Sequence, residues 1–182
     1  SEFIAYAKSN PGKLSYGTPG TGTPHHLAME SLKLKAGGLS IQHVPYKGEA
    51  PALQDLIGGN LEVMFAGARI SKPQYESGQA TVLAVSGTTR NSAFPAVPTV
   101  SEASLKGYAY EYWHGVVVPA KTPAATVARL NAAFVKALNA PELQSWMVTG
   151  GSGAEWTGST PAEMQAHMQR EIKSAGELVK SI

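Results

Sequence analysis

Short apolar runs take turns along the chain with stretches in which apolar residues recur at the helical spacing of about 3.6 residues. Apolar runs short enough to be buried strands lie at Leu14–Gly17, Ile41–Tyr46, Leu61–Phe65 and Thr81–Ser86. Helical spacing of apolar residues predicts helices at Glu2–Ser9, from about Pro24 to Lys35, at Pro51–Ile57 and at Lys72–Ser77. Strands that alternate with helices indicate an α/β fold, with one mostly parallel sheet and helices on both of its faces.

The pattern changes between Thr88 and Gly107, where Pro95 and Pro98 interrupt any regular element. We expect an ordered loop there, with a short helix near Ser101–Ser104. The stretch Tyr110–Val118 then predicts a long strand. Its length and the proline that ends it indicate a crossing between two domains.

The C-terminal part of the chain is predicted to be helical. Thr122-Pro123 predicts a helix start, with threonine as N-cap and proline at the first helical position. Pro141 restarts the helix, which continues to Gly150-Gly151, and the capping box at residues 160–163 opens the last helix. Apolar residues at helical spacing predict one buried face on these helices: Val127, Leu130, Phe134, Leu138, Leu143, Trp146, Met147, Met164, Met168, Ile172, Ala175 and Val179.

Composition narrows the classes of function. The 182 residues carry 15 Lys and Arg against 13 Asp and Glu, a net charge of +2, and form no basic stripe of the kind that binds nucleic acid. The absence of cysteine excludes disulfides and thiolate chemistry. No apolar run is long enough to cross a bilayer. The first residues already read as an amphipathic helix, so we expect that preceding sequence, including an export signal, is missing.

The segment with the clearest chemistry is residues 16–27, YGTPGTGTPHHL. It follows a predicted strand and opens a predicted helix, whose first N–H groups lack partners and carry partial positive charge. Its glycines allow an anion to approach the backbone, and its threonine hydroxyls add uncharged donors. This combination is typical of a site for a carboxylate or a phosphate. A tight strand-to-helix turn that binds nothing has the same composition, so the loop alone does not distinguish the two.

Known nucleotide-binding motifs do not fit this loop. The spacing from Gly17 to Gly22 is that of a P-loop, but Thr23-Pro24 replaces the lysine and the Ser/Thr that should follow. The loop also lacks the third glycine of a dinucleotide-binding fingerprint, because His25 occupies that position.

Metal and catalytic sites are not indicated either. His25 and His26 are adjacent on a helix and point about 100° apart, so we expect one to face a cleft and the other the surface. Residues 150–154 (GGSGA) are not a nucleophile elbow, because they lack the final glycine and do not follow a strand. Glu62 and Glu111 have no partner carboxylate that the sequence places nearby. We therefore predict no catalytic residue, no metal and no cofactor.

Several longer motifs follow one another along the chain. They read NPGKLSY (10–16), GTGTPHHL (20–27), VPYKGEAPALQDLIGG (44–59), LAVS (83–86), PAVPTVSEA (95–103) and WHGVVVPAKTP (113–123). In this order they resemble segments of the substrate-binding proteins of tripartite tricarboxylate transporters, often called the Bug family. The corresponding family patterns are NPGKLxY, GxGTxxHL, VPYKGxxPAxxDLLGG, LAVT, PDVPTVAEAG and WxGxxxPxxTP. Together they are far more specific than any single loop.

The resemblance implies a periplasmic-binding-protein type II-like fold, in which two lobes with mostly parallel sheets enclose a ligand cleft. Residues 1–111 would be the second, ligand-binding lobe. Residues 112–182 would be the hinge crossing and the C-terminal helical part of the first lobe. The N-terminal part of the first lobe would be absent. The apolar helix faces of the remnant would then need another partner, and self-association through the incomplete first lobe would supply one.

The chain departs from the family pattern at three places. Ala66-Gly67 stand where the family often has Asp-Asn, so any side-chain contact from those positions is lost. Glu62 replaces the usual aspartate of the preceding segment, and Pro24-His25 replace small polar residues at a helix start.

The resemblance also implies a function. A periplasmic solute-binding protein of this kind would capture a small organic carboxylate, such as a di- or tricarboxylate. It would deliver the ligand to the membrane permease subunits of a tripartite tricarboxylate-type transporter, with no chemical step. Two alternatives stay open: a ligand-sensing module of a signalling system with the same fold, and an enzyme that uses the same loop to bind a phosphate.

Eight residues are predicted to form the ligand-facing wall of the second lobe: Thr18, Gly20, Thr21, Gly22, Thr23, His26, Tyr46 and Gly67. The backbone N–H groups of Gly22 and Thr23 would point at one ligand carboxylate. The Thr23 hydroxyl would either donate to the ligand or cap the helix, two roles that compete. Tyr46 and Gly67, at the ends of neighbouring strands, would close the sides of the pocket.

Overall fold

A computed structural model describes residues 2–149 and 158–182 of the chain. It divides into two compact units, Ser1–Tyr112 and Trp113–Ile182, which are described separately below. The predicted helix end at Gly150-Gly151 and the loop that follows it lie outside the described residues.

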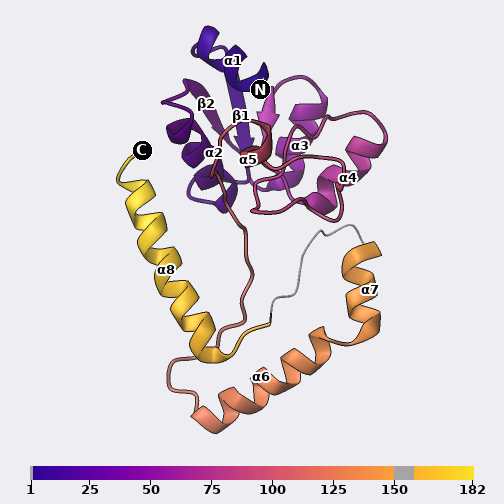
Figure 1. Ribbon diagram of the computed structural model, residues 1–182, viewed down its shortest axis with the longest axis vertical. Helices are drawn as coiled ribbons and strands as arrows, with labels where there is room; N and C mark the ends of the chain where they lie inside the picture. The colour runs from indigo at the N-terminus through magenta and orange to yellow at the C-terminus, as the bar shows by residue number, and fades with distance from the viewer. Residues whose placement is uncertain (1, 150–157) are drawn as a thin grey trace. The chain divides into compact units, whose positions relative to one another are not determined.

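The first unit is built on a three-stranded parallel sheet with the strand order β2-β1-β3 (Figure 1). Its elements in chain order are α1 (Glu2–Ser9), β1 (Leu14–Thr18), α2 (Pro24–Lys35), β2 (Ile41–Pro45), α3 (Glu49–Ile57), β3 (Val63–Met64), α4 (Ala68–Glu76) and α5 (Val100–Ala103). The predicted α/β fold with a parallel sheet is confirmed.

Strand β1 is central, and its alternating side chains pack against helices on both faces of the sheet. Leu14 and Tyr16 join a buried cluster with residues of α1 and α2, among them Met29. The backbone of Gly17 faces the other way, and a Cβ atom there would lie 2.5 Å from Leu61 Cδ1 and 3.3 Å from Ala52 of α3. Only glycine allows this close approach, which lets α3 cover the second face of the sheet.

The predicted fourth strand at Thr81–Ser86 is wrong. Only Val85 of this segment forms a bridge, a single parallel one with Thr99. Val85 donates its N–H to Pro98 O, and Val100 donates to Val85 O. The segment therefore pairs with the chain that leads into α5, and not with β3, which has only two residues.

Residues 94–108 contribute to the core of the first unit, although their prolines predicted only a loop. The short helix α5 lies close to its predicted position and begins with a capping box formed by Thr99 and Glu102. Tyr108 is 2% exposed, and its hydroxyl donates to Ala28 O in α2 at 2.9 Å. This bond joins the segment after α5 to the helix that covers the sheet.

The predicted strand at Tyr110–Val118 is also wrong. Tyr110 donates its N–H to Ser86 O, but the described residues provide no strand that pairs with the rest of the segment. Val116 and Val117 are 63% and 71% exposed. Strand composition alone does not form a strand, because a strand needs a neighbour for its backbone hydrogen bonds.

The second unit contains α6 (Ala124–Leu138), α7 (Pro141–Thr149) and α8 (Pro161–Val179). The capping box of Thr160 and Glu163 opens α8 as predicted. The N-cap of α6 is Pro123, one residue later than the predicted Thr122. No helix among the described residues is long and apolar enough to cross a membrane.

The buried helix face predicted for this unit is wrong in the structure. No described residue of α6 or α8 is fully buried, and Phe134 and Ile172 are 42% and 70% exposed. The apolar spacing is real, but the described residues of this unit supply too little opposing surface to cover these faces.

Tyr108→Phe is expected to lower the opening free energy of the first unit by about 1 kcal/mol, because a buried donor is lost. Hydrogen exchange of the β1 amides measures this change, since those amides report on the first unit alone. Tyr6→Phe is the control, because Tyr6 is 51% exposed. Equal exchange rates in the two variants would show that the Tyr108 bond contributes nothing.

Candidate functional site

The carboxyl ends of the three strands meet at one edge of the sheet, because the strands are parallel. The loops that follow them lead directly into α2, α3 and α4, whose N-caps are Thr23, Gly48 and Gly67. None of these N-cap residues caps its helix with its own side chain. Three helix N-termini, each with partial positive charge and N–H groups that need partners, therefore converge on this edge.

The loop between β1 and α2 is folded back on itself by Thr23. The Thr23 hydroxyl donates to Gly20 O at 2.7 Å and makes no capping bond to α2. The Thr23 N–H also points to Gly20 O, at 3.4 Å. Gly22 has a φ of 78°, a left-handed conformation that glycine adopts without strain. The hydroxyl that was expected to bind the ligand or cap the helix instead closes the loop.

The N–H groups available at this edge differ from the predicted pair. Gly22 donates its N–H to Nδ1 of His26 at 3.2 Å, and Thr23 is used within the loop. The structure gives no acceptor among the described residues to the backbone N–H groups of Thr21, His25 and His26. Thr21 and Gly22 are exposed. The start of α2 therefore keeps N–H donors at an accessible loop.

Thr18 lies beneath this loop and does not face solvent. It is fully buried, and its hydroxyl lies 2.7 Å from His43 Nε2. The His43 ring stacks between those of Tyr16 and His26, with centroid distances of 4.9 Å and 4.2 Å. Thr18 and His26 thus belong to a packed column that supports the loop from the core side.

Burial, hydrogen bonds and neighbouring charges shift the pKa values of the titratable groups in and beside this column. Burial is the main cause that lowers the pKa of His43, and the neighbouring His26 adds to it. Burial alone would raise the pKa of Glu30, but hydrogen bonds from Lys33 and Tyr16 outweigh it and hold that pKa below its usual value. The Tyr16 pKa is raised by burial and by its 2.5 Å bond to Glu30. The lowered pKa of His43 favours its neutral form, and the Lys33–Glu30 ion pair beside the column is partly buried.

Tyr46 and Gly67 are both at the predicted edge, but each is already bonded within the first unit. The Tyr46 hydroxyl donates to Asp55 Oδ2 at 2.6 Å, and this bond raises the pKa of Tyr46 to about 12. The Gly67 N–H donates to Glu49 Oε1. Of the eight predicted residues, Gly20, Thr21, Gly22 and Thr23 form the loop, and His26, in the first turn of α2, is bonded to it through the Gly22 N–H.

Two residues at this edge were not predicted to be part of the site. His25 Nε2 lies 3.2 Å from Glu49 Oε1, and the His25 side chain is only 15% exposed. The expectation that one histidine of the pair lies on the surface is therefore wrong. The sequence pattern began α3 at Pro51, so it left Glu49 in a loop, whereas the helix begins at Glu49 itself.

The Glu49 carboxylate is held ionised by its surroundings. Burial would raise its pKa, but hydrogen bonds from His25 and from the Gly67 N–H, together with the charges of His25 and Arg69, lower it overall. The surroundings thus favour the ionised form of Glu49 at this edge of the sheet.

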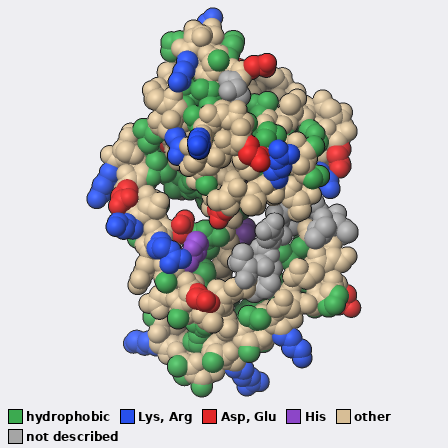
Figure 2. Space-filling view, in the orientation of Figure 1, with side chains coloured by type: hydrophobic (Ala, Val, Ile, Leu, Met, Phe, Trp, Pro, Cys, Tyr) green, Lys and Arg blue, Asp and Glu red, His purple; other side chains and the backbone are tan. Residues whose placement is uncertain are grey.

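Other kinds of site find less support. Among the described residues no group of three or more His, Asp or Glu is placed to hold a metal ion. On the face shown in Figure 2, Lys and Arg side chains are spread among acidic ones and form no continuous stripe.

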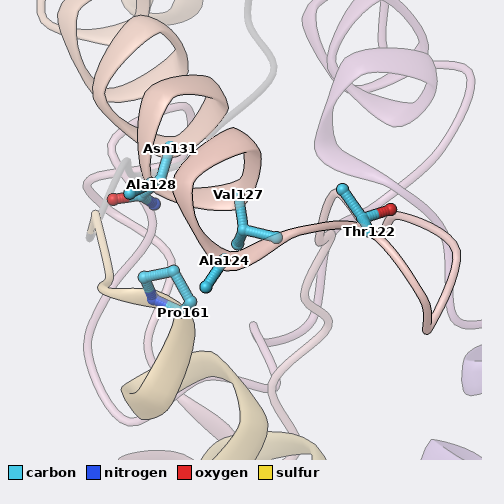
Figure 3. Close-up of a pocket in the computed structure, with 6 residues that line it drawn as sticks. All are labelled: Thr122, Ala124, Val127, Ala128, Asn131 and Pro161. Carbon is cyan, nitrogen blue, oxygen red and sulfur yellow. The ribbon is translucent and has the colours of Figure 1, made fainter.

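The second unit contains an open hollow of about 460 Å³ (Figure 3). It lies between the start of α6 and the start of α8 and is lined by Thr122, Ala124, Val127, Ala128, Asn131 and Pro161. Its lining has no charged side chain, and Asn131 is bonded to Ser159 O. This hollow offers little to orient an ionic ligand.

A parallel sheet that gathers helix N-termini at the carboxyl ends of its strands is a frame for binding small anions. The whole chain, residues 1–182, matches the family described as the tripartite tricarboxylate transporter family receptor. The chain belongs to this family, which confirms the resemblance found in its motifs.

Relatives and solved structures agree with this assignment. A "UPF0065 protein in gbd 5'region" from Cupriavidus necator is 41% identical over 140 residues, which cover 77% of this chain and 42% of that protein. The structure "R. palustris Rpa4515 with adipate" is 34% identical with a TM-score of 0.88, over 98% of this chain and 59% of that one. The periplasmic binding protein BugD is 31% identical with a TM-score of 0.85, over 99% and 60%. The chain spans about half the length of the curated relatives it matches.

The His43 column predicts a pH dependence of stability. The folded pKa of His43 is lowered from 6.5, so the unfolded chain takes up its proton first as pH falls. Below 6.5 the unfolded state binds more protons, and the free energy of unfolding should fall until the folded pKa is reached. Urea unfolding at several values from about pH 7.5 to about pH 5 tests this. His43→Gln, which keeps a partner for Thr18, should flatten the dependence, whereas His167→Gln in the second unit should not.

Proposed function

We propose that this chain is part of a periplasmic solute-binding protein that captures a small organic carboxylate for the membrane permease of a tripartite tricarboxylate-type transporter. The observation that carries the proposal is the carboxyl edge of the sheet. There the N–H groups of Thr21 in the loop and of His25 and His26 in the first turn of α2 have no acceptor among the described residues. Such donors suit a carboxylate oxygen, and membership of the receptor family supports this ligand class.

In this proposal residues 1–111, which make up all of the first unit except Tyr112, are the ligand-binding lobe. Residues 112–182 are the hinge crossing and the C-terminal helical part of the other lobe. Closure of two lobes would bury the ligand and raise its affinity. The similarity to Rpa4515, whose structure was solved with adipate, favours a dicarboxylate among the candidate ligands.

The proposed protein has no catalytic role. Its function needs only reversible capture, which backbone donors provide without a nucleophile, an acid–base pair or a cofactor. The titratable groups of the loop region, His26 and His43, are stacked on each other and bonded to the Gly22 N–H and the Thr18 hydroxyl. This arrangement favours support of the loop over proton transfer.

The full-length protein is expected to bind adipate or a related carboxylate and to gain thermal stability from it. Melting temperatures across a panel of mono-, di- and tricarboxylates, with phosphate and ATP alongside, identify the ligand class. A response to phosphate or ATP, with none to any carboxylate, would favour the enzyme alternative.

Gly22→Val should weaken carboxylate binding at least about tenfold, because a branched side chain at the loop tip blocks the approach of an anion and disturbs a left-handed residue. Gly59→Val is a matched control. Gly59 has nearly the same φ, 76° against 78°, and a Cβ atom would meet nothing within 4 Å at either glycine. Gly59 lies after α3, at the opposite end of the sheet from the loop. Calorimetric affinities that fall equally in both variants would exclude the loop as the binding wall.

Thr23→Ala should have a smaller effect. It removes one neutral hydrogen bond, from the Thr23 hydroxyl to Gly20 O, worth about 1 kcal/mol or about fivefold in affinity. Thr23→Ser keeps the hydroxyl and should retain the affinity of the unaltered protein. A loss of affinity in Thr23→Ser as large as in Thr23→Ala would show that the hydroxyl does not act through this bond.

A further inference from the structure

Glu49 connects all three loops of the carboxyl edge. It is the first residue of α3, directly after the loop that follows β2. Its Oε1 accepts the N–H of Gly67, the N-cap of α4, and pairs with Nε2 of His25, the second residue of α2. The Glu49 side chain is 26% exposed.

The effect of this arrangement differs between two neighbouring helix ends. At α4 the N-cap N–H already has an anionic partner, supplied by Glu49. At α2 the side chain of Thr23 makes no cap, and the N–H groups of His25 and His26 have no acceptor among the described residues. An incoming carboxylate therefore finds N–H groups without an acceptor at the start of α2, next to a carboxylate that is already bonded to His25 and to the N-cap of α4.

We propose that Glu49 determines the charge specificity of this wall. It directs one ligand carboxylate to the start of α2 and disfavours a second anionic group on the side of α4. The class of ligand that fits has a single carboxylate on this side, next to an uncharged group or a hydrogen-bond donor that faces Glu49. This inference rests on the proposed function, because it assigns a preference to the same site.

The charged groups around Glu49 determine the size of the effect. His25 contributes from α2, and Arg69, an exposed residue of α4, contributes from the other side. Both are opposite in charge to Glu49 when protonated, so they weaken its repulsion without removing it. The effect should therefore be moderate and should decrease as salt screens it.

Adipate and hexanoate provide a matched pair of probes, since both have six carbons but carry two charges and one. Glu49→Gln keeps an oxygen acceptor for the Gly67 N–H and removes the charge. In the full-length protein this variant should shift the ratio of the two affinities toward adipate by about three- to tenfold. The shift should shrink at high salt, which a purely structural role of Glu49 would not cause.

Glu62→Gln is the control for the change in net charge. Glu62 also accepts a backbone N–H, from Ser15 at 2.7 Å, but it lies at the amino end of β3, away from the edge. Its substitution should leave the affinity ratio unchanged.

The outcomes distinguish a failure of the proposed role of Glu49 from a failure of the proposed carboxylate binding. If the unaltered protein binds neither adipate, hexanoate nor any other carboxylate, the proposed function fails. If carboxylates bind and Glu49→Gln leaves the ratio unchanged, or shifts it no more than Glu62→Gln does, the role of Glu49 is refuted. The Gly67 amide resonance checks folding, since it should keep a hydrogen-bonded shift in Glu49→Gln.

Discussion

The first unit depends on the burial of β1 on both of its faces. Tyr16 points toward α2 and is fully buried, while the next residue, Gly17, must have no side chain because α3 and Leu61 occupy that space. Two successive residues of β1 thus pack against opposite layers of the unit. A one-residue shift in the register of β1 would place each of them against the wrong layer. The strand ends at Thr18, which is also fully buried and bonded to His43. The glycine-rich loop starts directly after this anchored residue, so the core determines where the loop begins.

The same parallel arrangement explains why charge gathers at one edge. Parallel strands require crossover helices, and each helix then begins where a strand has ended. The resulting N-termini need negative partners, which come either from the protein or from a ligand. In this chain Glu49 is that partner at α4, and the described residues provide no such side chain at α2. Helices that begin at the same edge of the sheet thus differ in their partners, because the N-cap N–H of α4 is bonded to a carboxylate and the first N–H groups of α2 are not.

Features that depend on local signals could be predicted from the sequence. The bounds of α1 and α2 agree with the prediction, because the proline that opens α2 and the glycine-containing turns that follow both helices are local signals. The contacts within the candidate site were not predicted, since the bond from Gly22 to His26 and the pair of His25 with Glu49 depend on how the helices pack. Periodicity carries no information about which of two adjacent histidines finds a partner from another loop. The predicted strand at Thr81–Ser86 failed for a similar reason, because its residues were suitable but its neighbour was chosen by tertiary packing.

In the second unit the helices form but, among the described residues, their apolar faces are not buried, although an amphipathic sequence pattern usually predicts both. Helix formation in α8 is secured locally by the capping box of Thr160 and Glu163, whatever lies opposite the helix. Burial of an apolar face is not local, and Ile172 and Phe134 stay largely exposed in the described structure. An amphipathic helix gains most of its stability from the surface it packs against, more than from its own propensity. The apolar residues of α6 and α8 are spaced to pack against another surface. The described residues of this unit do not provide that surface.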